Sequence, residues 1–348
     1  MTTEPSRTDD GPEPATTVGA RGVRASSLVG LLLGGTALAL VVRTLSREWD
    51  QAEAHLREAR PGWLLAAVVL AALGMTSIGV VWGRVLAQLG VAVGVARVVA
   101  WYFVGELGKY LPGGVWPVVG RGELARRGGV PRTRAYTSVA LSLGMLYLAS
   151  LFVVAAFLPF AVSGGGFSPW MLCLLALPAG VVALHHRVLE WIVGVVQRLT
   201  GRVVRVDVPR WRQSLSLVAM YLPTWVFIGV ATWAVARALT PDAPFARVVF
   251  SAVLSWVAGF LAVPVPAGAG IREAVLLATS GLDGGVAAAT AIVARVIFIG
   301  VDAVGALVSA PTATRRRGGV QAGPLPDTVD RHDDRAPGAL DDEDPHPA

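Results

Sequence analysis

Four charged residues stand inside otherwise apolar sequence, and together they could bind an anionic group. Arg272 and Glu273 are the only charges in residues 248–282. Arg295 and Asp302 lie seven residues apart in the next apolar block, so a helix would place them on one face. Burying a lone charge in hydrocarbon costs at least about 2.5 kcal/mol. These side chains therefore need partners or a water-filled cavity.

The pairing of these charges has more than one interpretation. Arg295 and Asp302 fit a structural ion pair or an interfacial position as well as a binding site. Arg272 and Glu273 are adjacent in the sequence and therefore point apart, so they need two different partners. That requirement favours a polar cavity, in which a guanidinium group would bind the phosphate or pyrophosphate of an anionic headgroup.

A second charged segment surrounds Lys109, the only lysine among 30 basic residues. Its presence is either chance or a requirement for a compact ammonium group. Glu106 and Arg121 flank it along the chain. The sequence has no Gly-x-x-x-x-Gly-Lys-Ser/Thr loop for a nucleotide, and His185-His186 has no neighbouring acid for a metal. No cofactor and no metal are expected.

Proline and glycine interrupt the chain beside both charged segments. Proline removes a backbone donor and glycine permits turns, so helices are expected to break there. Broken helices at matching places in two halves of opposite orientation indicate a transporter-type site. The alternative is a pair of ordinary turns at the membrane surface. The candidate substrate-binding residues are Lys109, Pro112, Gly113, Gly114, Arg121, Pro266, Gly268, Gly270, Arg272, Glu273, Arg295 and Asp302.

Long apolar blocks must position these residues. Hydrophobic residues make up 54% of the 348, and charged residues only 16%. A spanning helix needs about 20 apolar residues. The blocks predict an all-α, polytopic transmembrane helical bundle with about six full spans and two Pro/Gly-broken re-entrant hairpins in a pseudo-inverted arrangement. The expected spans are Ala25–Val42, Gly62–Trp82, Ala135–Val162, Pro169–Leu184, Ser214–Leu239 and Val286–Ser309, and the expected hairpins are Arg97–Gly120 and Val248–Leu282.

Loop arginines predict the orientation. Residues 121–134 and 185–212 are rich in arginine, as is Arg315-Arg316-Arg317, and the positive-inside rule places all three in the cytoplasm. We expect a multi-pass protein of the cell membrane with both termini cytoplasmic. The expected domains are a disordered tail (1–24), a transmembrane domain (25–310) and a disordered acidic tail (311–348). The scattered arginines form no basic face, so no nucleic-acid partner is expected.

Two motifs resemble those of the flippase-like family named for the transmembrane region of lysylphosphatidylglycerol synthases. The first is Gly108-Lys109-Tyr110-Leu111-Pro112-Gly113-Gly114-Val115-Trp116 with Gly120-Arg121. The second and more specific is Pro264-Val265-Pro266-Ala267-Gly268-Ala269-Gly270-Ile271-Arg272-Glu273, followed by Arg295. The resemblance covers residues 26–309 and implies a bacterial plasma-membrane protein that moves lipids between leaflets. The chain departs from the pattern in two ways: it lacks the aminoacyl-transferase domain, and its residues 142–146 lack the Glu-Arg pair of many members.

These features lead us to expect a flippase for an anionic phospholipid or a polyprenyl-phosphate-linked lipid. We do not expect it to be an enzyme. Lipid movement would be driven by a membrane gradient or would proceed without an energy source. A second hypothesis is a non-catalytic membrane partner of a cell-envelope glycosyltransferase or lipid-modifying enzyme. A membrane-embedded headgroup transferase is the third. The expected partners are anionic membrane lipids and, under the second hypothesis, such an enzyme. No oligomeric state is predicted.

Overall fold

The computed structural model describes residues 59–111, 115–161, 211–261 and 268–314, the single residues Ala39, Arg43 and Arg57, and the strand at 321–322. Several predictions therefore fall outside the described residues. They concern the N-terminal tail, most of the C-terminal tail, the spans Ala25–Val42 and Pro169–Leu184, and the turn residues Pro112, Gly113, Gly114 and Pro266.

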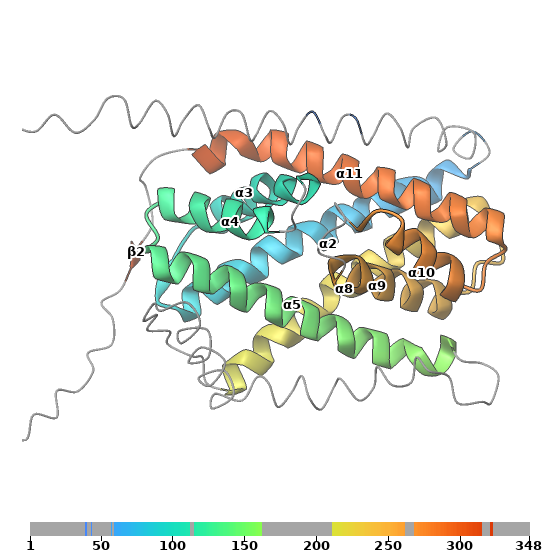
Figure 1. Ribbon diagram of the computed structural model, residues 1–348, viewed down its shortest axis with the longest axis horizontal. Coiled ribbons are helices and arrows are strands. Elements are labelled where there is room, and N and C mark those ends of the chain that lie inside the picture. The colour runs from blue at the N-terminus through green and yellow to red at the C-terminus, as the bar shows by residue number, and fades with distance from the viewer. Residues whose placement is uncertain are drawn as a thin grey trace, which may run out of the picture.

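Four long apolar helices form the frame of the described part (Figure 1). They are α2 (Pro61–Gln88), α5 (Arg132–Ala161), α8 (Trp211–Leu239) and α11 (Gly284–Thr314). Each is long and apolar enough to cross a membrane. Each overlaps one of the apolar spans expected from the sequence, so the predicted all-α membrane bundle is confirmed. Helix α11 continues through Pro311 to Thr314, beyond the boundary expected at residue 310.

Short helices occupy the two segments that were expected to be hairpins. In the first, α3 (Val95–Glu106) runs into the 3₁₀ turn η1 (Leu107–Tyr110), and α4 (Trp116–Arg127) returns beside α3. In the second, α9 (Phe245–Leu261) packs against α10 (Ile271–Thr279). Before α3, strand β1 (Val91–Ala92) pairs antiparallel with β2 (Gln321–Ala322).

The two halves of the described chain form an inverted repeat. Helices α2, α3, α4 and α5 correspond in order to α8, α9, α10 and α11. Each principal packed pair has a counterpart: α3 packs on α11 as α9 packs on α5, and α4 packs on α5 as α10 packs on α11. Helices α2 and α8 pack against each other and run in opposite directions, and the hairpins enter from opposite ends (Figure 1). The predicted pseudo-inverted arrangement is therefore present.

Interhelical hydrogen bonds hold the long helices in register. Buried polar groups between apolar helices find partners across the interface, where each bond contributes on average about 0.6 kcal/mol in a membrane. Three such bonds link α2, α5 and α8: Ser77 Oγ to Thr224 Oγ1 at 2.6 Å, Trp82 Nε1 to Ser138 Oγ at 3.0 Å, and Ser142 Oγ to Tyr221 Oη at 2.6 Å.

Candidate functional site

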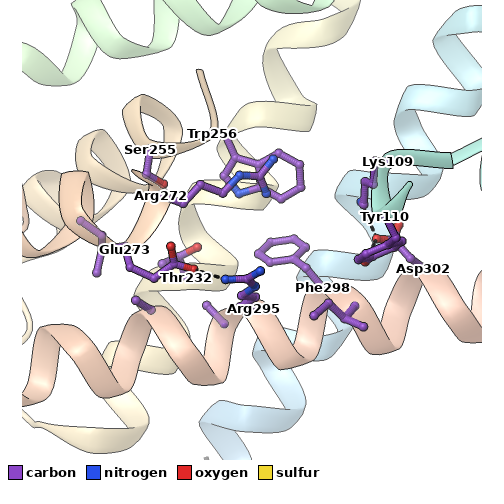
Figure 2. A pocket seen from close by; sticks show the side chains of 14 residues that line it. Lys109, Tyr110, Thr232, Ser255, Trp256, Arg272, Glu273, Arg295, Phe298 and Asp302 are labelled. Carbon is purple, nitrogen blue, oxygen red and sulfur yellow. Dashed lines mark hydrogen bonds and ion pairs between the residues drawn. The ribbon is translucent and has the colours of Figure 1, made fainter. Parts of the chain in front are cut away.

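A cavity lies between the two hairpins and helix α11 (Figure 2). Its volume, as the space open to the centres of water-sized spheres, is about 50 Å³. One water needs about 10–15 Å³ on that measure, so the cavity has room for several waters or one phosphate-sized group. Charged and aromatic residues dominate the lining: Lys109, Tyr110, Trp256, Arg272, Glu273, Arg295, Phe298 and Asp302.

The cavity lies deep within the bundle. Arg295 and Asp302, both on its wall, flank the midpoint of the 31-residue helix α11. At about 1.5 Å per residue this helix is roughly 46 Å long, so both charges stand far from either end. Phe298 lies between two groups of polar residues, with Arg272, Glu273 and Arg295 on one side of it and Lys109, Tyr110 and Asp302 on the other (Figure 2).

Glu273 fixes the start of helix α10 and pairs with Arg295. Its Oε2 accepts a 2.6 Å hydrogen bond from the backbone N–H of Gly270, and its Oε1 accepts one of 2.7 Å from Arg295 Nη1. The backbone N–H groups at a helix start favour such a carboxylate. Gly270 has φ of 84° and Gly268 has φ of 66°, conformations that glycine adopts at little cost. These glycines shape the turn that brings Glu273 to α11.

Arg272 contacts an aromatic ring instead of an acid. Its guanidinium carbon lies 4.0 Å from the centre of the Trp256 ring, and Nε is buried without a hydrogen-bond partner in the described residues. No carboxylate of the described chain lies within ion-pair distance of it. A cation over a tryptophan face gains about 2 kcal/mol when desolvated, which holds the side chain in place without neutralising its charge.

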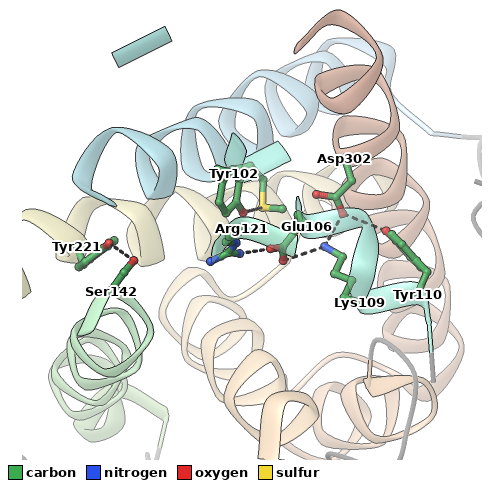
Figure 3. A network of polar contacts seen from close by, with 9 residues as sticks. Tyr102, Glu106, Lys109, Tyr110, Arg121, Ser142, Tyr221 and Asp302 are labelled. Atoms are coloured by element: carbon green, nitrogen blue, oxygen red, sulfur yellow. Dashed lines mark hydrogen bonds and ion pairs between the residues drawn. The ribbon is translucent and has the colours of Figure 1, made fainter. Parts of the chain in front are cut away.

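The other end of the cavity holds a chain of paired charges (Figure 3). Arg121 pairs with Glu106, Lys109 lies 3.5 Å from Glu106, and Lys109 pairs more closely with Asp302. Tyr110 Oη donates a 3.0 Å hydrogen bond to Asp302 Oδ2. Asp302 is fully buried, and its Oδ1 has no hydrogen-bond partner in the described residues.

The structure brings six of the predicted site residues to one place. Lys109, Arg272, Glu273, Arg295 and Asp302 line the cavity, and Arg121 adjoins it through Glu106. Gly268 and Gly270 form the turn before α10 but are not part of the lining. Arg295 and Asp302 do not pair with each other, because each finds an opposite charge on a different hairpin.

Sequence reasoning did not assign roles to the aromatic lining or to Glu106. Trp256 faces two cations, at 4.0 Å from Arg272 and 5.8 Å from Lys109, yet it looks like an ordinary core residue of an apolar helix. Glu106 stands three residues before Lys109. Residues at this spacing contact each other on a helix, so the spacing could have predicted their ion pair. No group of three or more His, Cys, Asp or Glu residues in the described ranges could hold a metal ion.

An inverted repeat of apolar helices around a central charged cavity defines a polytopic α-helical membrane protein. Residues 27–309 match the family described as the lysylphosphatidylglycerol synthase TM region, and the chain belongs to that family. No curated protein matches the chain. The match includes both hairpins and every residue of the cavity lining.

Proposed function

We propose that this protein moves lipids with an anionic headgroup between the leaflets of the cell membrane. The observation that carries the proposal is the surplus positive charge of Arg272. Three cations in and beside the cavity have an acid partner: Arg121 has Glu106, Lys109 has Asp302, and Arg295 has Glu273. Arg272 is the fourth cation, and no acid of the described chain pairs with it. A phosphate group would supply the missing charge.

The surroundings of the cavity favour a lipid over a soluble anion. The helices around it expose large apolar side chains, among them Leu65, Leu73, Val304, Leu307 and Val308. A headgroup entering the cavity would leave its acyl or prenyl chains against such surfaces, in the hydrocarbon phase. The cavity volume suits a phosphate group rather than a whole lipid. Membership of a family named for a lipid-synthase membrane region supports the same class of cargo.

Leaflet exchange in proteoliposomes tests the proposal. Purified protein is reconstituted in phosphatidylcholine vesicles that contain fluorescent phosphatidylglycerol, and the fraction bleached by external dithionite is followed over time, with and without a proton gradient. The wild type is expected to exchange the label faster than empty vesicles. Arg272→Gln should slow exchange about 10- to 100-fold, the effect of losing a charge-assisted hydrogen bond of about 1.5–3 kcal/mol.

Arg126→Gln is the matched control. Arg126 lies at the exposed end of α4 and, within the described residues, bonds with Glu123 alone, outside the cavity. Its hydrogen bonds lower the pKa of Glu123 to about 2, so both groups are charged in the assay. This ion pair therefore differs from those of the cavity in its location. Exchange equal to that of empty vesicles under every gradient would refute the flippase and favour the hypothesis of a non-catalytic membrane partner. Modification of the labelled headgroup would instead favour a transferase.

A further inference from the structure

The inverted repeat gives the cavity arginine a counterpart in the first hairpin. In the second hairpin, Arg272 of α10 lies over Trp256 of α9, which stands three residues before Gly259. A Cβ atom on Gly259 would lie 2.7 Å from Arg272 Cγ, so the arginine side chain crosses α9 directly over this glycine. The arrangement therefore consists of a ring, a glycine on the same helix and an arginine on the returning helix.

The first hairpin repeats that arrangement. Arg121 of α4 lies 4.6 Å from the ring centre of Tyr102 of α3, which stands three residues before Gly105. A Cβ atom on Gly105 would lie 2.7 Å from Arg121 Cγ. Since α3 corresponds to α9 and α4 to α10 in the fold, Arg121 and Arg272 are equivalent positions of the two halves.

The two halves differ at the residue after the glycine. In the first hairpin this residue is Glu106, which pairs with Arg121. In the second it is Phe260, which stacks on Tyr147 of α5 at a ring-centre distance of 3.8 Å. One arginine is thus neutralised by its own hairpin, and the other faces the cavity without an acid partner in the described chain.

We propose that Arg121 is a second binding site for the lipid headgroup, closed in this structure by Glu106, which occupies the place of the anionic cargo. This inference rests on the proposed function, because the ligand class is the same. In an inverted-repeat transporter, movement of one repeat against the other exposes a central site alternately to each side. Two equivalent arginines, one open and one closed, suit a cargo that passes from one half to the other.

The neighbouring Lys109 allows Glu106 to leave Arg121 without becoming an unpaired charge. Lys109 already lies 3.5 Å from Glu106 and can receive its carboxylate when a headgroup replaces it at Arg121. Asp302 would keep the hydrogen bond from Tyr110. The displaced carboxylate therefore keeps an opposite charge beside it, which avoids the cost of isolating it deep in the bundle.

Binding of a short-chain lipid to the purified full-length protein tests the second site. The probe is dihexanoyl-phosphatidylglycerol, titrated calorimetrically below its critical micelle concentration, with inorganic phosphate as a parallel probe. Arg272→Gln should weaken lipid binding about 10- to 100-fold. Adding Glu106→Gln to this variant should restore the affinity to within about tenfold of wild type, because Arg121 is then open. Arg272→Gln with Glu106→Gln and Arg121→Gln should lose it again.

Thermal unfolding distinguishes the loss of a binding site from a general folding defect. Glu106→Gln leaves Arg121 without its acid, so the variant should unfold at a lower temperature and recover on addition of the lipid. The variant that also carries Arg121→Gln should show no such recovery. Glu123→Gln, which alters a partly buried acid on the same hairpin away from the cavity, should behave as wild type.

If Glu106→Gln restores no lipid binding in the Arg272→Gln background, and lipid does not raise the unfolding temperature of Glu106→Gln, the second site is refuted. The loss caused by Arg272→Gln alone would still support the first site. Absence of binding to the wild type would instead refute the proposed function. Phosphate binding as tight as lipid binding would overturn the assignment of a lipid headgroup.

Discussion

At the scale of single residues, the position of Arg272 depends on the absence of a side chain at residue 259. Gly259 lies under the arginine, and Gly268 approaches the same point from the turn, where its own Cβ would lie 2.7 Å from Gly259 Cα. Arg272 and Gly268 therefore approach residue 259 so closely that only a hydrogen atom fits there in place of a side chain. The guanidinium group reaches the Trp256 ring through this gap.

Gly259→Ala should displace the Arg272 side chain and slow lipid exchange by at least about tenfold, because the new methyl group would lie 2.6 Å from Nε. The fold should survive, since the displaced group is a side chain that borders the cavity rather than backbone. The control is Gly144→Ala on α5, where a Cβ meets no atom within 4 Å. Dithionite bleaching measures both variants. Normal exchange by Gly259→Ala would show that the position of Arg272 is unimportant.

Residue types revealed most charged members of the site, but not their pairing. Lys109, Arg272, Glu273, Arg295 and Asp302 were identifiable because each interrupts an apolar stretch. Their ion-pair partners depend on how the hairpins pack against α11. The spacing of residues along a single helix does not predict this packing. The acid after Arg121 illustrates the difficulty: Glu123, two residues on, bonds with Arg126 and Arg127 at the surface, and the true partner of Arg121 is Glu106.

At the scale of elements, contact between α3 and α11 joins the first hairpin to the second half. Gly305 of α11 faces Phe103 of α3, and a Cβ at residue 305 would overlap the phenylalanine ring. Small residues permit such close helix packing in membranes. The contact fixes the distance between Asp302, one turn earlier on α11, and Lys109, just after α3.

Gly305→Ala should destabilise the protein by about 1–3 kcal/mol, the usual cost of overpacking. Gly300→Ala on the same helix meets no atom within 4 Å, and should be neutral or stabilising by up to about 1 kcal/mol because alanine favours the helix. Unfolding in mild detergent, followed by circular dichroism, compares the two. Equal effects at both positions would mean that α3 and α11 do not pack this closely.

The hairpins were predictable as breaks, since proline and glycine interrupt apolar sequence in both. Their internal symmetry was predictable only in outline. The motif after each break places an arginine near an acid, and the arginines do correspond between the halves. The acids do not, because Glu273 binds Arg295 of α11 and Glu123 faces its own helix end. Three-dimensional packing, rather than the local motif, decides which positions are equivalent.

At the scale of the whole molecule, charge differs between the two ends of the bundle. Arg126 and Arg127 end α4, and Arg132 and Arg134 begin α5, all at one end. The loops at the other end carry Asp242 before α9 and Asp283 before α11. The arginine-rich end is expected in the cytoplasm.

Cysteine labelling tests this orientation in intact cells. With Cys173 replaced by serine, Asp242→Cys should react with a membrane-impermeant maleimide from outside, because residue 242 is exposed at the predicted outer end. Arg127→Cys, exposed at the other end, should react only after permeabilisation. The opposite pattern would reverse the topology, and labelling of both from outside would contradict the bundle itself.

The inverted repeat implies that helix packing alone does not determine the orientation of this protein in the membrane. A half-turn about an axis in the membrane plane exchanges the first half of the described bundle for the second. Nearly the same helix pairs would then face each leaflet. The instruction for correct insertion must then come from the loops. Moving a few arginines from one set of loops to the other should therefore yield molecules that insert in the opposite orientation and remain well folded.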